Sequence, residues 1–211
     1  SDSILKIVLP DESVVWLNKN SSLKSPSEFT GKNRKVKLEG EAFFEIARNT
    51  EHPFIAEGED AIVKVLGTSF NFRSTGIKES SRLIVKTGKV KFKQKRISSK
   101  SWILTSGEKI CYNTGNMNFE KSKVENENYL AWKRGWLRFS GTPVKMVFEQ
   151  LSEFYDKKFI LKEDIPEDIT LSGNFRTDSL GEIIELLELS LDLQIQKEEN
   201  NSYIVQKSSL K

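Results

Sequence analysis

Residues 35–46 read KVKLEGEAFFEI, and this stretch decides the fold of the first half of the chain. Charged and apolar residues alternate from Lys35 to Glu39, with the two-residue period of a β-strand that buries one face. Gly40-Glu41 then breaks the run before a second apolar stretch, Ala42–Ile46. The pattern predicts strands on both sides of that break and excludes a helix.

Short β-rich runs of the same kind extend outward, from Ile4 to about Phe119, with turn residues between them. They recur roughly every 8–12 residues, which is typical of a sandwich, a barrel or a solenoid-like roll. We therefore expect a mainly β protein with an all-β domain over residues 1–125. The other runs are Val14–Leu17, Ala61–Leu66, Ser69–Arg73, Arg82–Lys86, Val90–Lys93, Trp102–Leu104 and Lys109–Tyr112.

Helical spacing of apolar residues begins only in the second half of the chain. Val144–Tyr155 carries an apolar stripe with the i, i+3, i+4, i+7 spacing of an amphipathic helix. We expect Thr142 to be its N-cap and Pro143 its first helical residue. A second helix is expected to start at Asp178, with its stripe over Leu180–Leu191.

The two helical segments agree position by position when one is shifted by 36 residues, so that Phe139 matches Phe175. Each copy has the order strand, helix, strand. The repeat predicts a small α+β domain of two βαβ-like units over residues 136–207, with both helices on one face of a small sheet. Residues 126–135 are expected to connect the domains, and residues 208–211 to form a tail.

The composition is that of a globular protein, with 37% hydrophobic and 30% charged residues. Lys and Arg total 33 against 30 Asp and Glu, which gives a formal net charge of +3. Basic residues are interleaved with acidic ones along the sequence, so we expect no basic stripe and no nucleic-acid partner.

Three further features bear on the compartment and extent of the chain. Cys111 is the only cysteine, so no internal disulfide is expected, and it fits a small buried apolar residue. No apolar run approaches the 18 residues of a membrane span. The sequence begins Ser1-Asp2-Ser3 without an initiator Met, so we expect a fragment of a longer protein.

Residues suited to catalysis are few. His52 is the only histidine, so any catalytic triad would have to use it, and a structural or surface role is expected instead. Gly67 and Gly76 are too isolated to form a phosphate-binding loop. We expect no enzymatic activity, no cofactor and no metal site.

The dipeptide Gly67-Thr68 is a candidate site of self-cleavage. A hydroxyl beside Gly in a strained turn can attack the preceding carbonyl, an N→O acyl shift that cleaves the chain. The structural interpretation is a bend between two strands. Gly141-Thr142 has the same letters in the expected helix cap, so the dipeptide alone is a weak signal.

Four tryptophans, Trp16, Trp102, Trp132 and Trp136, leave a second class of function open. Stacking of exposed tryptophans on a sugar would make the first half a carbohydrate-binding module of the cell envelope. Packing inside the protein is the expected role, because three of the four lie in or beside apolar runs. A cell-envelope hydrolase is a third reading, weakened by its dependence on His52.

Several motifs together resemble those of the FecR-type anti-sigma regulators. Glu12 is one departure, because that family usually has Gly after Pro-Asp. Residues 136–207 are in turn similar to the secretin/TonB short N-terminal domain. The motifs are Leu9-Pro10-Asp11, Gly40-Glu41-Ala42-x-Phe44-Glu45, Val65-Leu66-Gly67-Thr68-x-Phe70-Asn71 and Ala131-Trp132-Lys133-x-Gly135-Trp136-Leu137-x-Phe139.

The resemblance implies a role in signalling. FecR-type proteins have a cytoplasmic anti-sigma segment, one transmembrane helix and a periplasmic region like this chain. That region senses an outer-membrane TonB-dependent transporter, often through the N-terminal signalling domain of the transporter, and the signal frees an extracytoplasmic-function sigma factor. Some relatives cleave themselves at the Gly-Thr that matches Gly67-Thr68.

A protein-binding relay of this kind would work through backbone groups on an exposed strand edge, by β-augmentation. We expect the edge to be Thr170–Phe175 or Ser202–Val205. The candidate partner-binding residues are Thr170, Ser172, Asn174, Ser202 and Tyr203.

Overall fold

The computed structural model describes residues 3–75, 81–95, 100–113, 118–162, 165–166 and 168–208. Ser1, Asp2, Gly76 and most of the expected tail lie outside these ranges. The chain divides into two compact units, residues 1–126 and 127–211. Strands predominate, so the expected mainly β fold is confirmed. Among the described helices, none has the length and apolar character needed to cross a membrane.

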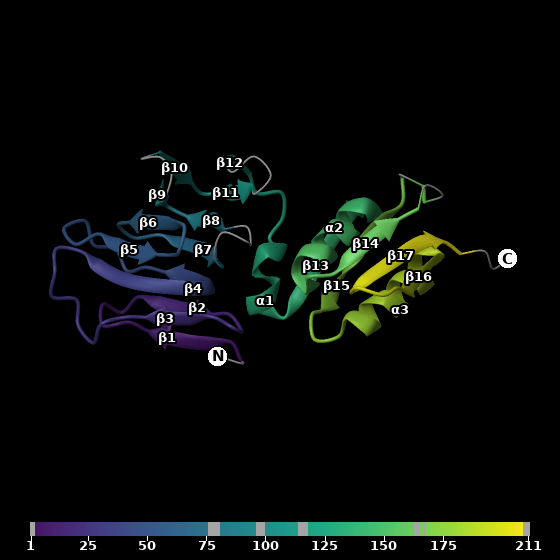
Figure 1. The fold of residues 1–211 in the computed structure, drawn as a ribbon, viewed down its shortest axis with the longest axis horizontal. Coiled ribbons are helices and arrows are strands. Elements are labelled where there is room, and N and C mark those ends of the chain that lie inside the picture. Colours follow the sequence, from purple (N-terminus) through teal and green to yellow (C-terminus); the bar gives the residue numbers. More distant parts are fainter. Residues whose placement is uncertain are drawn as a thin grey trace. The chain divides into compact units, whose positions relative to one another are not determined.

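The first unit is a twelve-stranded sheet that curls into two facing halves, sheet 1 and sheet 2, joined through β4 (Arg34–Glu45) (Figure 1). Sheet 1 has the order β1 (Leu5–Val8), β2 (Val14–Leu17), β4, β7 (Ser69–Ser74), β8 (Arg82–Thr87), β11 (Glu108–Asn113), β12 (Asn118–Lys123). Sheet 2 has the order β3 (Ser22–Lys24), β4, β5 (Phe54–Glu57), β6 (Ala61–Val65), β9 (Lys89–Gln94), β10 (Ser101–Thr105).

β4 does not break at Gly40, contrary to the sequence prediction. The strand continues through it, pairing with β5 before Gly40 and with β7 from Gly40 onward. Gly40 has φ +96°, which a residue with a Cβ rarely adopts. A Cβ there would also lie 2.3 Å from the Ser21 hydroxyl oxygen. The glycine therefore lets one strand turn from sheet 2 into sheet 1.

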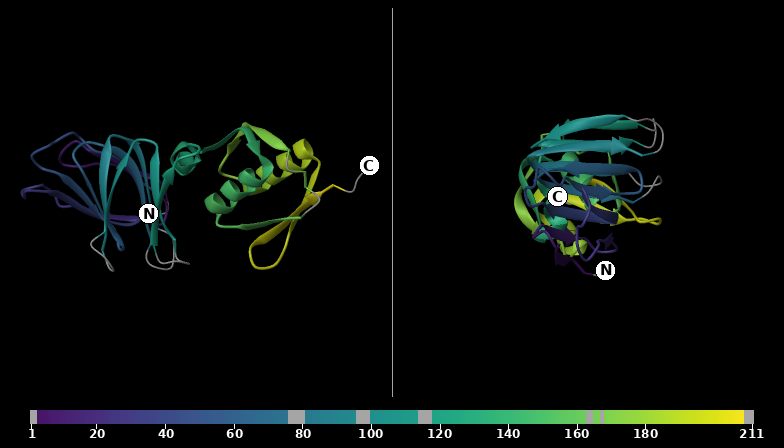
Figure 2. Two further views of the ribbon diagram at one scale, coloured as in Figure 1. Left: turned by 90° about the horizontal axis from the view of Figure 1, so that it is seen from above. Right: turned by 90° about the vertical axis from the view of Figure 1, so that its left-hand side faces the viewer.

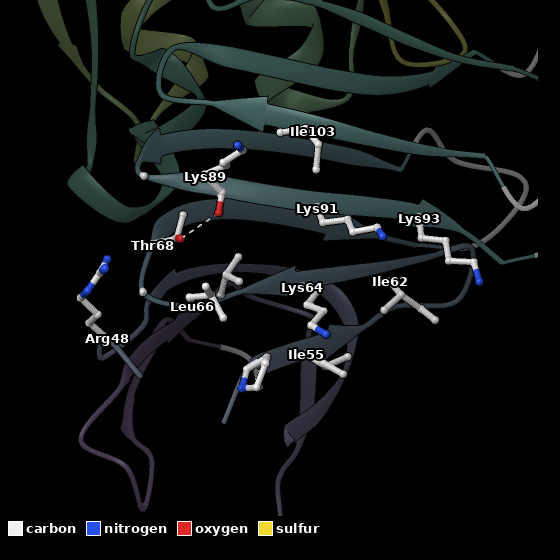
Figure 3. Close-up of a pocket in the computed structure, with 14 residues that line it drawn as sticks. Arg48, Ile55, Ile62, Lys64, Leu66, Thr68, Lys89, Lys91, Lys93 and Ile103 are labelled. Carbon is white, nitrogen blue, oxygen red and sulfur yellow. Dashed lines mark hydrogen bonds between the residues drawn. The ribbon is translucent and has the colours of Figure 1, made fainter. Parts of the chain in front are cut away.

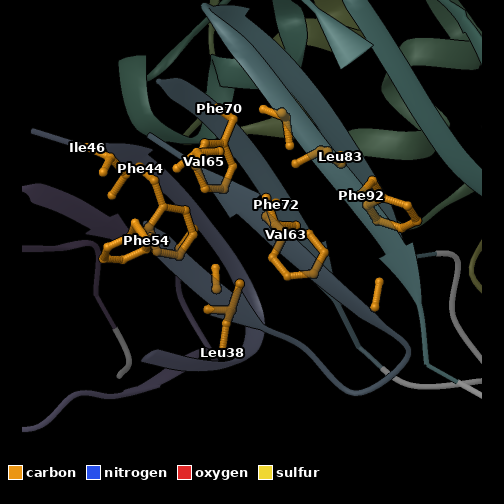
Figure 4. Packing of buried hydrophobic residues seen from close by; sticks show 14 of the residues in the cluster. Leu38, Phe44, Ile46, Phe54, Val63, Val65, Phe70, Phe72, Leu83 and Phe92 are labelled. Carbon is orange, nitrogen blue, oxygen red and sulfur yellow. The ribbon is translucent and has the colours of Figure 1, made fainter. Parts of the chain in front are cut away.

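One hydrophobic core lies between the two sheets, and aromatic rings fill its centre (Figure 4). Phe44 and Phe70 stack with ring centroids 4.9 Å apart, and Phe54 is 6.1 Å from Phe44. All three rings are completely buried. In each strand the apolar residues that recur every second position point into this core, and this is why the sequence predicted the strands.

The second unit holds two helices between two small sheets (Figure 2). α2 and α3 each contact strands of both sheets. A short 3₁₀ helix, η1 (Asn128–Leu130), and α1 (Ala131–Arg134) occupy the expected connector. The elements are β13 (Trp136–Pro143) with β15 (Thr170–Arg176), then β14 (Lys158–Leu161), β17 (Ser202–Lys207) and β16 (Leu193–Lys197), with α2 (Val144–Tyr155) and α3 (Leu180–Leu191).

The 36-residue repeat is present in the backbone. α2 and α3 are twelve residues each, and both of their ends are offset by 36. Each ends at an aspartate in the left-handed conformation, Asp156 and Asp192, both with φ 52°. The expectation of one sheet is wrong, because β13–β15 forms a separate two-stranded sheet beside the three-stranded β14–β17–β16.

Both helix starts differ from the sequence prediction. α3 starts at Leu180 rather than at Asp178, and its cap is Ser179, whose hydroxyl accepts a hydrogen bond from the Glu182 N–H at 3.2 Å. Pro143 occupies the N-cap of α2 and makes no side-chain cap, so Thr142 is not the cap. Thr142 belongs to β13, which continues directly into α2. The first N–H of the helix, that of Val144, donates to the Ile169 carbonyl at 2.9 Å instead of to a capping side chain.

Candidate functional site

The Gly67-Thr68 dipeptide lies at a corner where the chain passes from β6 in sheet 2 to β7 in sheet 1. Backbone groups of the segment after β4 hold this corner. The Ile46 N–H donates to the Thr68 carbonyl at 3.1 Å, and the Asn49 N–H donates to the Leu66 carbonyl at 2.7 Å. The bend expected from the sequence is therefore present.

A second corner packs against the first. Gly88, with φ +82°, returns the chain from β8 to β9, and a Cβ on it would lie 3.1 Å from the Thr68 hydroxyl oxygen. That hydroxyl donates to the Lys89 carbonyl at 3.2 Å, and Thr68 is only 4% exposed. A Cβ on Gly67 would lie 2.7 Å from the Arg48 Cα. Packing alone thus accounts for both residues of the dipeptide.

A groove of about 710 Å³ opens beside the corner, over the outer face of sheet 2 (Figure 3). Apolar side chains from β5, β6 and β10 line it, with lysines between them, and Arg48 lies beside Thr68. Among the described residues that line it there is no histidine, cysteine, aspartate or glutamate, so the lining offers no carboxylate or imidazole as a general base. The lining residues are Arg48, Pro53, Ile55, Ile62, Lys64, Val65, Leu66, Gly67, Thr68, Gly88, Lys89, Lys91, Lys93 and Ile103.

Strand register gathers lysines from four strands, β3, β4, β6 and β9, on this outer face. Residues directly opposite one another in a sheet project to the same side. One row across the sheet reads Lys35, Ile55, Lys64, Lys91, Ile103. The next row reads Lys24, Lys37, Glu57, Ile62, Lys93, Ser101.

We call this surface the lysine face, defined by Lys24, Lys35, Lys37, Lys64, Lys89, Lys91, Lys93 and Lys95. The sequence prediction that basic residues form no stripe is wrong. The residues are scattered over 72 positions of sequence and are brought together only by the pairing of the strands. The alternation of lysines over residues 89–95 already predicts one charged strand face, but no local pattern shows which other strands extend it.

Glu57 is one of two glutamates on the lysine face. Its carboxylate is 2.6 Å from the Lys95 ammonium, which also donates to the Gly58 carbonyl at 2.8 Å. This hydrogen bond, with the charges of Lys95, Lys37 and Lys35, lowers the pKa of Glu57 against the opposing effect of partial burial. The other, Glu39, accepts a hydrogen bond from the Ser22 hydroxyl at 3.3 Å.

The expected partner-binding strands differ in how their edges are used. β17 pairs with β14 on one side and β16 on the other, so Ser202–Val205 has no edge to offer and that prediction is wrong. The Tyr203 ring stacks on Phe159 at 5.0 Å, and the Ser202 hydroxyl donates to the Glu199 carbonyl. Both residues hold the unit together.

β15 does have an open edge, because within the described residues its only strand partner is β13. The residues Thr170, Ser172 and Asn174 of this strand are exposed to solvent. Ser172 also accepts a hydrogen bond from the Gly141 N–H at 2.8 Å.

Side chains cover two of the other edges in this unit. The Asn128 carboxamide bonds both the N–H and the carbonyl of Arg138 at 2.8 Å, on the outer edge of β13. Glu188 accepts from the Ile195 N–H at 2.7 Å, at the outer edge of β16. Covered edges cannot add a strand, so in the described part of the unit β15 and the four-residue β14 are the ones left open.

Sequence reasoning missed an apolar patch on α3. Leu186 is 48% exposed and Leu189 84% exposed, whereas Ile183 and Leu187 of the expected stripe are buried and its other members are partly buried. The signal was available, because leucines outside the i, i+3, i+4 stripe of an amphipathic helix face solvent.

The tryptophans and His52 give little to a sugar-binding or hydrolytic site. Trp16 is half-buried and tilted at 50° to Phe43, and Trp102 packs on the core beside Phe92 at 6.0 Å. Neither pair presents coplanar, exposed rings. His52 is exposed, and its carbonyl accepts from Arg34 at 2.8 Å. In the ranges that the structure describes, no three His, Cys, Asp or Glu side chains gather as a metal site.

Comparisons with known proteins cover both units. The model of the family described as FecR protein matches residues 1–91, and the model described as FecR, C-terminal matches residues 136–205. Two crystal structures of a candidate anti-sigma factor from Parabacteroides distasonis ATCC 8503, at 1.65 and 2.50 Å resolution, are similar at 31% identity and a TM-score of 0.68. Each alignment covers 99% of this chain and 96% of the crystallised chain. No protein with a curated description matches.

Proposed function

The chain belongs to the FecR family of anti-sigma regulators, and from that premise we propose that it is a sensing module that binds proteins and catalyses no reaction. The observation that carries the proposal is the alignment across both units with a candidate anti-sigma factor. A groove without carboxylates or imidazoles in its described lining supports a binding role. Membership of this family implies that the partner it regulates is a sigma factor.

The finer proposal concerns the signal that is relayed. The module lies in the periplasm, as the extracytoplasmic part of a single-pass inner-membrane protein, and reports the state of an outer-membrane TonB-dependent transporter. The cytoplasmic segment of the same protein then releases an extracytoplasmic-function sigma factor. The open edge of β15 supports this relay, because a strand of a partner can add to an exposed sheet edge. The resemblance of residues 136–207 to the secretin/TonB short N-terminal domain belongs to the same proposal.

The working surface of the relay is the open edge of β15. In an antiparallel pair, residues that face each other either exchange both hydrogen bonds or point both sets of groups outward. Both backbone groups of Arg138 bond to Asn128, so they point away from β15. Asn174 lies opposite Arg138, and its N–H and carbonyl therefore point to the open edge.

Two variants at Asn174 test the relay. Calorimetric titration of the chain with the periplasmic N-terminal domain of the transporter encoded nearest its gene should give saturable binding. Asn174→Pro removes the outward N–H but no bond to β13, and is expected to weaken binding at least tenfold. Asn174→Ala keeps that N–H and serves as the matched control. Equal affinities for the two variants would remove β15 from the proposal, and no binding by the unaltered chain would remove this transporter.

Cleavage between Gly67 and Thr68 stays a hypothesis. The Thr68 oxygen would attack the Gly67 carbonyl carbon, the C–N bond would break, and water would hydrolyse the resulting ester. In the structure the Thr68 hydroxyl donates to the Lys89 carbonyl, and a backbone carbonyl is too weak a base to take up its proton. We propose that the chain stays intact. Intact mass after expression tests this, with Thr68→Ala as the uncleavable reference, and fragments of residues 1–67 and 68–211 would contradict it.

A further inference from the structure

We propose that the lysine face of the first unit docks an acidic protein segment that carries apolar residues beside its carboxylates. This inference goes beyond the relay through β15, since it concerns a different unit and needs no transporter. It rests on the charge of the face, the apolar side chains within it and the absence of stacking groups along its described rows.

The charge of the lysine face is far from that of the whole chain. Eight lysines and the two glutamates Glu39 and Glu57 give it a formal net charge of +6. The chain has a net charge of +3, so the remainder of the molecule is net negative. A surface with such a concentrated charge attracts and orients partners of the opposite sign.

Some of these lysines stand directly opposite each other. Lys64 pairs with Lys91 between β6 and β9, and Lys24 pairs with Lys37 between β3 and β4. Like charges at such positions destabilise a sheet, because the side chains are only about 4.5–5.5 Å apart at Cβ. Carboxylates placed between them would offset that repulsion, so an acidic occupant is favoured over a neutral one.

Apolar side chains flank the central lysines of the groove. Ile55 and Ile62 are half-buried, while Leu66 is 40% and Ile103 45% exposed. The groove edges therefore bury apolar groups of an occupant, and its middle pairs with carboxylates (Figure 3).

Two features disfavour nucleic acid and phosphate polymers as the occupant. The described residues of the sheet rows include no aromatic side chain on which bases could stack. They also include no arginine, the residue that recognises phosphate bidentately, and Arg48 stands only at the end of the groove. Lysines with flanking isoleucines instead match a protein segment that mixes Glu or Asp with Leu or Ile.

Fluorescence anisotropy with a labelled peptide of four Leu-Glu-Asp repeats tests the proposal on the whole chain. We expect saturable binding that weakens at least tenfold between 50 and 300 mM salt, in line with the Debye screening of ion pairs. A peptide of Ser-Glu-Asp repeats should bind several-fold more weakly, and one of Leu-Lys-Lys repeats should not bind.

The variant K64E/K91E/K93E should lower affinity for the acidic peptide at least tenfold. K19E/K123E/K145E changes the net charge equally with exposed lysines off the face, and should change affinity less than threefold. Thermal melts by circular dichroism check folding, and K64Q/K91Q/K93Q replaces the reversal if it unfolds. Equal losses in both triple variants, or no binding, would overturn the proposal. So would stronger binding of heparin, single-stranded DNA or phosphatidylglycerol vesicles than of the peptide.

Discussion

Arg34 is the first residue of β4, and although it is charged it is only 3% exposed. It pairs with Asp11, donates to the His52 carbonyl at 2.8 Å and the Ala47 carbonyl at 3.0 Å, and its guanidinium lies 5.6 Å from the Phe54 ring centroid. We expect Arg34→Met to cost about 3–5 kcal/mol of unfolding free energy, because it leaves the largely buried Asp11 carboxylate without its ion pair and two backbone carbonyls without a donor. Urea denaturation measures the loss.

An exposed ion pair supplies the control for Arg34. Arg134 and Glu127 are 2.6 Å apart, with side chains 43% and 63% exposed. Arg134→Met should therefore cost no more than about 1 kcal/mol. Equal losses for the two variants would show that burial of the Arg34 pair contributes nothing.

Glu108 gives the clearest dependence on pH. Hydrogen bonds from Lys121, at 2.8 Å, and from Thr105, whose N–H donates at 2.7 Å, lower the pKa of Glu108 from 4.5 to about 2. Because its folded pKa lies below the unfolded one, the stabilisation is complete above pH 4.5 and is lost as the pH falls to 2. Glu108→Gln should thus be less stable than the unaltered chain at pH 6 and approach it near pH 2, in urea titrations across that range. Exposed Glu28→Gln controls for net charge, and a gap independent of pH would contradict the assignment.

Residues such as Arg34 and Thr68 show what the sequence could not reveal. Local alternation predicted the strands around them because each strand buries one face. The Asp11 that pairs with Arg34 lies 23 residues earlier, and the Lys89 carbonyl that Thr68 meets lies 21 residues later. Such partners depend on how strands come together, which no local window contains.

The start of α3 carries a prediction at the scale of an element. The Ser179 hydroxyl caps the helix through the Glu182 N–H, so Ser179→Ala should cost about 1 kcal/mol. The hydroxyl of Thr142, at the expected cap of α2, accepts from the Ser140 N–H within β13, on the strand side of the helix start. Thr142→Ala should therefore cost less than about 0.5 kcal/mol. A larger loss for Thr142→Ala in chemical denaturation would restore it as a cap.

The helices were predictable because their stripe and their 36-residue repeat are local, whereas the edges of the small sheets were not. β17 and β15 read alike in sequence, yet β17 is central and β15 is open on one side. The difference arises because β14 and β16 both pair with β17. β16 precedes β17 directly in the sequence, but β14 pairs with β17 across 44 residues, from Lys158 to Ser202, and no local window contains that pairing.

At the scale of the whole molecule, charge was the least predictable property. Over the whole chain acidic residues are interleaved with basic ones, and that led to the expectation of no basic stripe. On β9 the lysines alternate with apolar or uncharged residues and therefore share one face, and opposite residues in register extend that face across strands. The lysine face is therefore a product of topology.

The two hydrophobic cores share no residue: one is built from Leu9 to Phe119 and the other from Ala131 to Val205. Each core is cooperative by itself, so we expect calorimetry to resolve two unfolding transitions, one for each unit. Leu187 is completely buried in the second core, and Leu187→Ala should cost about 2–5 kcal/mol. That loss should lower the second unit's transition by about 8 °C or more and leave the other in place.

Arg34→Met supplies the reciprocal variant, since Arg34 belongs to the first unit. It should lower only the transition that Leu187→Ala spares, because a change in one core does not alter packing in the other. Each variant then acts as the control for its counterpart. A single transition, shifted by both substitutions, would mean that the units unfold together. In that case a signal bound at one unit would reach the other through shared stability, and the relay would need no separate moving part.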